Sequence, residues 1–483
     1  MTMAAVVLAT GLFQAAPCDL KDLPADAPPP AGVECGWVSV PRDHAAPDGP
    51  TLRLWTARLK ATGPAGPDAV LYIHGGPGIA TVDALLPSLD KIKSLAAMRA
   101  NSDVYLFDQR GSGRSEETLC PDLDRQLGAV ADLGLDAAQE DERSRILFAQ
   151  CRAALDDAGT DLAAYTTAQT AADLETLRQA FGVRQWNLSS VSYGTLVALH
   201  AMRTQPASLR AVILNSPYPP NSMAWAEQAS STAAAYQAIG RACAAQPACA
   251  SAFGDVVEKL EQTLARLDRT PVLDGERKIT GRLFATALWP VAVRSTTVKF
   301  VPLAISRAYA GDADAIKGLV RTFASGSAFG DASRAQGFAI SCHEGGRTRD
   351  AYARARALYP ALVSATPDDS WDKLCAAFRP GYADPAFFAP VASSIPTLIY
   401  AGALDPATPV ADAYQAVRFL DRATIVEVAG AAHAPLGLDE CTIGIATAFL
   451  DDPQATPDMA CLRARAPLAF AHEGLETLFA PTP

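Results

Sequence analysis

The sequence predicts an α/β fold in which a mostly parallel sheet is interrupted by a long helical insertion. Short continuous apolar runs, typical of strands buried on both faces, alternate with segments of helical periodicity. The clearest runs are 69–73, 104–107, 183–187, 211–214 and 397–400. From about 217 to 390 the alternation stops and an Ala-rich helical pattern replaces it. Strands that alternate with helices pair in parallel, and their carboxyl ends share one edge of the sheet.

Composition limits the classes of protein to consider. The chain has 483 residues, 49% of them hydrophobic and 19% charged, which suits one large domain or two to three ordinary ones. Its net charge is −11, with the acidic residues scattered, so nucleic acids and anionic membrane surfaces are not expected partners. After the first twenty positions no run of 18 apolar residues occurs, so no integral membrane segment is expected there.

The first sixteen residues resemble a secretory signal peptide. Ala4–Phe13 is apolar and precedes the small-residue pattern Gln14-Ala15-Ala16. No Lys or Arg precedes the apolar stretch, so an ordinary buried strand is the alternative. We expect residues 1–16 to be a signal peptide and the protein to be secreted or periplasmic.

The ten cysteines fall in near-neighbour pairs, which favours disulfides over buried free thiols in an exported chain. There is no Cys-x-x-Cys pair, and we expect no metal site and no cofactor. Connectivity does not follow from sequence, so pairing by proximity is a hypothesis: Cys18–Cys35, Cys120–Cys151, Cys243–Cys249, Cys342–Cys375 and Cys441–Cys461.

The predicted domains follow from these patterns. The segment 17–216 is the first part of the core, 217–390 a helical cap, 391–455 the second part of the core, and 456–483 a tail. Within the first part, Cys35–Val40 and Leu52–Lys60 read as an antiparallel hairpin at a sheet edge.

A serine turn joins a strand-like to a helix-like segment. Leu188–Gly194 reads Leu-Ser-Ser-Val-Ser-Tyr-Gly, and Ser192 has a small residue at −2 and Gly at +2. A tight strand-to-helix turn of this kind holds a nucleophilic hydroxyl exposed at the top of an α/β sheet. Ser190 lacks Gly two residues later and is the weaker candidate. It also stands where Gly is usual, so we expect its Cβ to crowd the turn.

Two strand-end residues complete a catalytic set. A serine hydroxyl needs a base and a group that orients the base. Of the six histidines, His433 alone follows a late buried strand, and Asp405 follows the strand before it. The chain order Ser192, Asp405, His433 is that of α/β-hydrolases. The Gly-rich turn His74–Gly78 also ends a buried strand; it is either a plain tight loop or the source of one oxyanion-hole N–H.

These motifs resemble the prolyl aminopeptidase and secreted tripeptidyl aminopeptidase family of α/β-hydrolases. The likeness rests on 74–78, 108–115, 192–195, 402–409 and 433. It implies an α/β-hydrolase fold with a helical cap, and a serine exopeptidase that acts on peptides with a free N-terminus. We assign the backbone N–H groups of Gly76 and Tyr193 to the oxyanion hole. The resemblance also suggests that Glu344, after a cap cysteine, binds the substrate amine.

Two other readings stay open. An esterase or other acyl hydrolase uses the same fold and the same catalytic residues, because neither selects the leaving group. A non-catalytic binding protein on this scaffold is the remaining alternative, although such a protein has no need of the serine, the acid and the base together.

Overall fold

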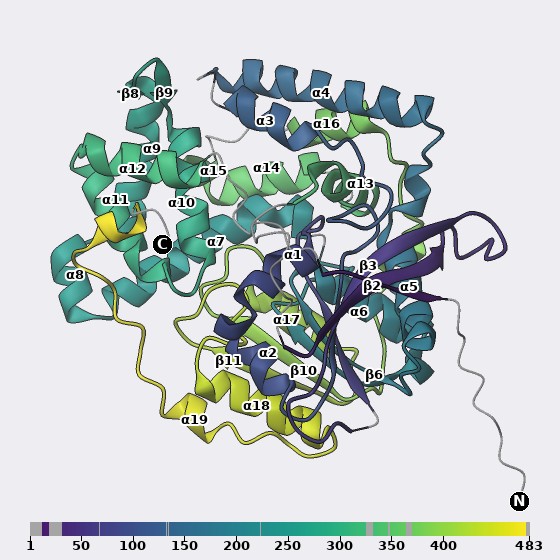
Figure 1. Ribbon diagram of the computed structural model, residues 1–483. Helices are drawn as coiled ribbons and strands as arrows, with labels where there is room; N and C mark the ends of the chain where they lie inside the picture. The colour runs from purple at the N-terminus through teal and green to yellow at the C-terminus, as the bar shows by residue number, and fades with distance from the viewer. Residues whose placement is uncertain are drawn as a thin grey trace, which may run out of the picture.

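A nine-stranded sheet lies at the centre of the described part of the chain (Figure 1). The computed structural model describes residues 12–18, 31–66, 68–131, 133, 135–222, 224–324, 332–345, 348–363 and 370–479. The strand order is β1-β2-β3-β5-β4-β6-β7-β10-β11. The bounds are β1 (Phe13–Ala16), β2 (Val33–Pro41), β3 (Thr51–Leu59), β4 (Ala69–Ile73), β5 (Val104–Phe107), β6 (Trp186–Val191), β7 (Leu209–Asn215), β10 (Thr397–Gly402) and β11 (Ala423–Val428).

The sheet is parallel from β5 through β11 and antiparallel on the other side, from β1 to β5. The predicted fold class and the β2–β3 hairpin are thereby confirmed. The hairpin is not outermost, however, because Phe13–Ala16 pair with β2 beyond it. Four residues of the predicted signal peptide thus form a strand. Residues 1–11 lie outside the described part, and the signal peptide stays a prediction.

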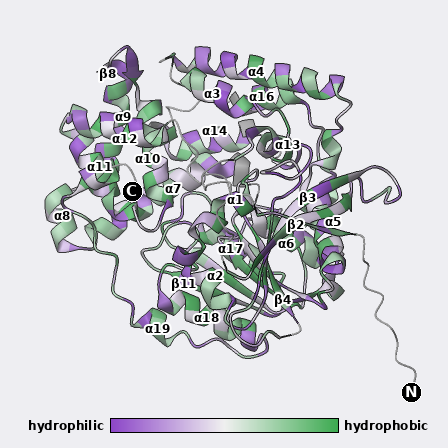
Figure 2. Cartoon of the chain, in the orientation of Figure 1, coloured by the Kyte–Doolittle hydropathy of each residue, from purple (hydrophilic) through white to green (hydrophobic). Residues whose placement is uncertain are grey.

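Helices cover both faces of the sheet. On one face α5 (Thr167–Ala180), α6 (Tyr193–Thr204) and α17 (Val410–Val417) share a hydrophobic cluster with the central strands. On the other face α1 (Thr81–Leu85), α2 (Lys93–Met98) and α18 (Glu440–Asp451) do so. Every residue of β6 and β10 is buried, as expected of strands covered on both faces. Because the central strands are covered on both faces, they consist largely of hydrophobic residues, coloured green in Figure 2.

The chain leaves the sheet after β7 and returns at β10. The helices between them are α7 (Ala224–Ala244), α8 (Pro247–Phe253), α9 (Val256–Arg269), α10 (Gly281–Val293), α11 (Val301–Tyr309), α12 (Ala313–Phe323), α13 (Arg334–Glu344), α14 (Thr348–Leu358), α15 (Pro360–Val363) and α16 (Ser370–Phe378). A small hairpin, β8 (Val272–Asp274) and β9 (Arg277–Ile279), joins α9 to α10. We call this helical region the cap. Most of its helices share a hydrophobic cluster that includes Leu264, Phe284 and Leu288, and Leu404 and Ala432 of the core also belong to this cluster.

Two helices that precede the cap in sequence pack against it. They are α3 (Leu123–Ala131) and α4 (Ala137–Asp157), and Phe148 of α4 contacts both Phe338 and Phe378. After α19 (Ala460–Arg463) the tail also reaches the cap, where Phe479 lies against Gly318 of α12. The predicted domain boundaries stay a prediction. Helix α4 and the C-terminal tail both make contacts with the cap across these boundaries.

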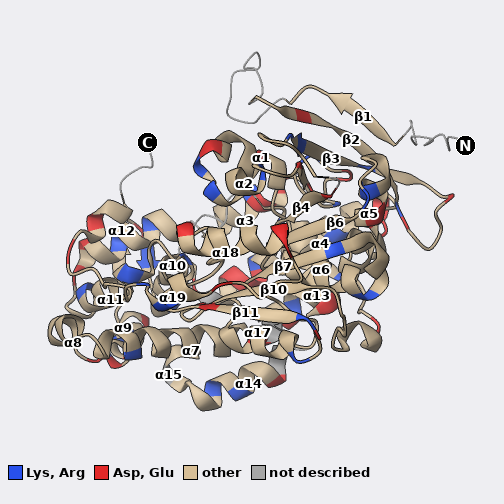
Figure 3. Ribbon diagram, turned by 90° about the horizontal axis from the view of Figure 1, so that it is seen from below, with Lys and Arg blue, Asp and Glu red and all other residues tan. Residues whose placement is uncertain are grey.

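All five disulfides predicted by proximity are present: Cys18–Cys35, Cys120–Cys151, Cys243–Cys249, Cys342–Cys375 and Cys441–Cys461. Such a set fits an oxidising compartment. Across the described residues, no helix combines the length and apolar character that crossing a bilayer requires. Lys and Arg are interspersed with Asp and Glu along the helices (Figure 3).

Candidate active site

Ser192 occupies a strained turn between β6 and α6. Its φ is 55° and its ψ −129°, in a region that non-glycine residues rarely adopt. Its N–H donates to the carbonyl of Asn215 (2.9 Å), and its carbonyl accepts the N–H of Thr195 (2.8 Å). Surrounding contacts therefore hold a conformation that costs on the order of 1–3 kcal/mol. Strain of this kind, on a sharp strand-to-helix turn, is the feature of a nucleophile elbow.

Two glycines make room for this turn. A Cβ at Gly194 would lie 2.3 Å from the carbonyl oxygen of Ile73. A Cβ at Gly75 would lie 2.7 Å from the Cβ of Ser192, so the Gly-rich turn passes directly beside the serine. Ser190 lies in β6, fully buried, and its hydroxyl donates to the carbonyl of Ile213 (2.7 Å). That hydroxyl faces a neighbouring strand, so position 190 accommodates serine.

Asp405 and His433 meet where β10 and β11 end. Nδ1 of His433 is 2.7 Å from Oδ2 of Asp405, and both side chains are buried. Oδ2 also accepts the hydroxyls of Ser216 (3.0 Å) and Thr408 (2.9 Å). Oδ1 accepts the N–H groups of Ala407 (2.8 Å) and Thr408 (3.0 Å). With this many donors the carboxylate is solvated by the protein in one fixed orientation, which in turn fixes the imidazole.

The end of β7 connects the serine to the acid and the base. β7 lies between β6 and β10, and the carbonyl of Asn215 holds Ser192. The next residue, Ser216, donates to Asp405 and accepts the N–H of Ala434 (2.9 Å), beside His433. Ser216 was absent from the predicted site. Its place directly after a buried parallel strand was the signal in the sequence.

His74 is the first residue after β4 and begins the Gly-rich turn. Burial lowers the pKa of its ring to about 4, and the neighbouring His433 adds to that effect. His74 directly precedes Gly75, which contacts Ser192. The turn at the end of β4 therefore lies against Ser192.

The cap holds the backbone of the loop that carries His433. The N–H of His433 donates to the carbonyl of Val293 at the end of α10 (2.9 Å). The N–H of Ala432 donates to the hydroxyl of Ser295 (2.9 Å). Nothing in the local sequence pattern pointed to these two contacts, because they join segments about 140 residues apart.

A family profile described as alpha/beta hydrolase fold matches residues 68–439, which is most of the chain. The chain belongs to the alpha/beta hydrolase fold family. A tripeptidyl aminopeptidase of Streptomyces coelicolor is 31% identical over 206 residues, which cover 41% of this chain and 37% of that protein. The serine protease Hip1 of Mycobacterium tuberculosis is 28% identical over 199 residues, which cover 40% of this chain and 37% of that protein.

The aligned part thus spans well under half of these curated relatives. Among solved structures, a proline iminopeptidase of Mycobacterium smegmatis superposes with a TM-score of 0.41 at 15% identity. That superposition covers 86% of this chain and 98% of the other.

Glu344, the predicted amine binder of this alpha/beta hydrolase, lies at the end of α13 and is only 3% exposed. Its Oε1 accepts the N–H of Thr167 (2.7 Å) and its Oε2 the hydroxyl of Thr167 (2.5 Å). That hydroxyl is 2.8 Å from the hydroxyl of Tyr193. Burial raises the pKa of Glu344 to about 7, and the two contacts with Thr167 oppose the rise.

A second buried carboxyl group follows Asp405 in the sequence. Asp412, in the first turn of α17, is 7% exposed, and burial raises its pKa to about 8. The charges of Asp405 and Glu227 add to the rise. Asp412 is the alternative candidate for the orienting acid, but the hydrogen bond of His433 goes to Asp405.

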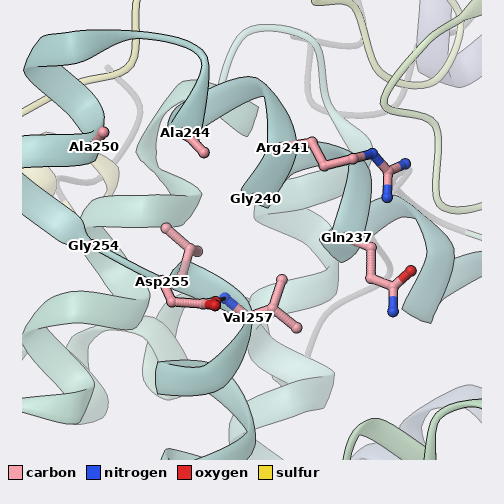
Figure 4. Close-up of a pocket in the computed structure, with 9 residues that line it drawn as sticks. Gln237, Gly240, Arg241, Ala244, Ala250, Gly254, Asp255 and Val257 are labelled. Carbon is pink, nitrogen blue, oxygen red and sulfur yellow. Dashed lines mark hydrogen bonds between the residues drawn. The ribbon is translucent and has the colours of Figure 1, made fainter.

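A hollow of about 490 Å³ in the cap lies apart from these residues (Figure 4). Residues of α7, α8 and α9 line it, among them Gln237, Arg241 and Asp255. Asp255 already caps α9 by accepting the N–H groups of Val257 and Glu258. Among the residues that the structure describes, no group of three or more His, Cys, Asp or Glu side chains is arranged to hold a metal ion.

Proposed function

We propose that the protein is a serine hydrolase that cleaves peptide bonds near free N-termini, with Ser192 as nucleophile, His433 as base and Asp405 as the orienting acid. The observation that carries the proposal is the 2.7 Å contact of Asp405 with His433 beside the strained turn of Ser192. The names of the curated relatives, a tripeptidyl aminopeptidase and a serine protease, support the choice of peptide substrates.

In the proposed reaction Nε2 of His433 accepts the proton of the Ser192 hydroxyl while Oγ attacks the carbonyl carbon of the substrate. The tetrahedral intermediate collapses, the C–N bond breaks, and His433 returns the proton to the leaving amine. Water then attacks the acyl-enzyme in the same way and releases the acid. Asp405 keeps Nδ1 protonated and stabilises the cationic imidazole throughout.

The oxyanion hole in this proposal consists of the N–H groups of Gly76 and Tyr193. Tyr193 begins α6, so its N–H is one of the helix's unpaired donors. Gly76 belongs to the turn that packs on Ser192 through Gly75. Each donor contributes about 3 kcal/mol to stabilising the transition state in enzymes of this kind.

A free N-terminus requires an acidic partner, and Glu344 is the cap carboxylate predicted for it. This role stays a prediction. In the structure both oxygens of Glu344 accept hydrogen bonds from Thr167. The disulfides support a secreted or periplasmic location.

Labelling with a serine-reactive fluorophosphonate tests the nucleophile. We expect the wild type to be labelled and Ser192→Ala to show no labelling, with Ser190→Ala as the matched control that keeps it. An unlabelled wild type would favour a non-catalytic binding protein. Labelling that survives Ser192→Ala and is lost in Ser190→Ala would overturn the assignment.

Replacement of the acid tests the remaining assignment. Asp405→Asn should lower kcat by roughly 10⁴-fold, because the imidazole loses the group that fixes its tautomer. Asp412→Asn, a change at a neighbouring buried carboxyl group, should leave kcat nearly unchanged. A loss of less than tenfold in Asp405→Asn, with a large loss in Asp412→Asn, would reverse the two roles.

Substrate class is decided by side-by-side assays. Peptide anilides with a free or a blocked amine and simple aryl esters are compared by kcat/KM. Preference for the free amine is expected. Preference for the blocked peptide or for the ester would replace the peptidase proposal with an esterase or another acyl hydrolase.

A further inference from the structure

Helix α13 contacts the loops that follow β4 and β5 and the first residue of α5. In Figure 1 it lies between α16 and the sheet, and the Cys342–Cys375 disulfide ties it to α16. With 11 residues it is about 16 Å long, enough to reach across several strand ends. Its two ends make contacts of different kinds.

The first end lies on the Gly-rich turn after β4. The N–H of Ser333, the N-cap of α13, donates to the carbonyl of Gly78 (2.9 Å). One turn later Gly337 packs on the same loop, where a Cβ would lie 3.1 Å from the carbonyl oxygen of Pro77. Between them Gln336, fully buried, lies against Gly78 and against Gly111 in the loop after β5. This end therefore fixes the turn that carries Gly76.

The second end reaches the residue after the nucleophile. Glu344 accepts two hydrogen bonds from Thr167, which is the first residue of α5. A carboxylate at a helix N-terminus is a favourable placement. Since the hydroxyl of Thr167 donates to Glu344, it is left as an acceptor for the hydroxyl of Tyr193. Tyr193 is fully buried, so this hydrogen bond fixes its side chain. The backbone N–H of the same residue lies beside Ser192.

We propose that α13 is a positioning element for the oxyanion hole, and that Glu344 acts as its positioning residue on Tyr193 through the hydroxyl of Thr167. Its two ends hold the two predicted oxyanion donors, one by backbone contact and one by a chain of side chains. In this role Glu344 never contacts the substrate. The inference rests on the proposed serine mechanism, but it does not depend on a peptide substrate.

The test uses Thr167→Val, which removes the hydroxyl and keeps both the side-chain shape and the N–H to Glu344. We expect kcat to fall about tenfold, less than when an oxyanion donor is deleted, with KM unchanged. Thr167→Ser keeps the hydroxyl and should restore kcat to within about twofold. Tyr193→Phe should match Thr167→Val, and the double variant should be no worse than either, because both remove the same link.

Glu344→Gln separates positioning from amine binding. A positioning role lowers kcat equally for a free-amine peptide anilide and for an amine-free aryl ester. A loss confined to the free-amine substrate would overturn the proposal and assign Glu344 to the amine. Unchanged kcat in Thr167→Val would overturn it too.

Two controls keep the result interpretable. Melting temperatures identify a variant that has merely unfolded, and Thr167→Ser then still tests the hydroxyl within a folded protein. If the wild type cleaves only esters, the ester kcat and the rate of fluorophosphonate labelling still report on the oxyanion hole. A result that refutes the peptidase proposal can thus be told apart from one that refutes the positioning role of α13. Only full activity without Ser192 would refute both proposals.

Discussion

Gly402→Ala tests how closely the loop of Asp405, the proposed acid, and the loop of His433, the proposed base, must approach each other. Gly402 ends β10, three residues before Asp405. A Cβ there would lie 1.9 Å from the carbonyl oxygen of Ala432 and 2.8 Å from that of Ala431. Cβ atoms essentially never come closer than 3.0 Å to such atoms, so the backbone before His433 must retreat by about 1 Å.

The expected effect follows from that distance. A retreat of about 1 Å takes the 2.7 Å contact between Asp405 and His433 out of normal hydrogen-bond range. Misplacement of a catalytic group by about 1 Å costs on the order of 100-fold in rate. Overpacking a buried site costs a further 1–3 kcal/mol, roughly, of the free energy of unfolding. We therefore expect Gly402→Ala to lower kcat about 100-fold and to lower the melting temperature.

Gly444→Ala is the matched control. Gly444 lies on the exposed side of α18, and a Cβ there meets nothing within 4 Å. Alanine in a helix interior is more stable than glycine by about 0.5–1 kcal/mol, so this variant should melt slightly higher with unchanged kcat. The assay is kcat, KM and melting temperature for the three proteins. A Gly402→Ala protein with at least half the wild-type kcat and an unchanged melting temperature would refute the reasoning.

Two further predictions concern stability. The pKa of Asp412 is raised to about 8, whereas an unfolded aspartate titrates near 3.9, so the folded state binds the proton more tightly and stability falls as the pH rises through that interval. Asp412→Asn should therefore gain melting temperature over the wild type progressively from about pH 4 to about pH 8, and a constant difference would contradict this. Removing the Cys342–Cys375 bridge, which spans 33 residues, should cost about 4 kcal/mol in denaturant unfolding, and removing Cys243–Cys249, which spans 6, about 2 kcal/mol. Equal losses would argue against the loop-closure account.

The predictable parts of the fold are those that depend on the pattern of neighbouring residues in the sequence. Buried parallel strands are short apolar runs, and the residues soon after such a strand lie at the carboxyl edge of the sheet, where α/β proteins bind ligands. This rule led to Asp405 and His433, which the structure brings together. The strand before Asp405 is fully buried, whereas β11, before His433, lies at the edge of the sheet and is only partly buried, contrary to the prediction. Positions 75 and 194 need glycine because the Gly-rich turn after β4 passes very close to the turn that carries Ser192.

What escaped prediction depends on contacts between distant segments. A strand was only the alternative to a signal peptide at the N-terminus, and it is the pairing of Phe13–Ala16 with β2 that identifies β1. Ala351–Leu362 has a continuous helical pattern, yet it divides into α14 and α15, and Pro360 begins the second helix. The hydrogen bond between Ser216 and Asp405 and the packing of α4 on the cap have no periodicity to reveal them.

The hydrogen bond from the N–H of His433 to the carbonyl of Val293 means that both core and cap position the proposed base. A chimaera with the cap of a related protein would have to keep the segment from Val293 to Ser295. Without it, the N–H groups of Ala432 and His433 would lose the hydrogen bonds that they donate to the cap. The choice of a new cap for this scaffold is therefore constrained at the C-terminal end of α10, in addition to any constraint from the residues that bind substrate.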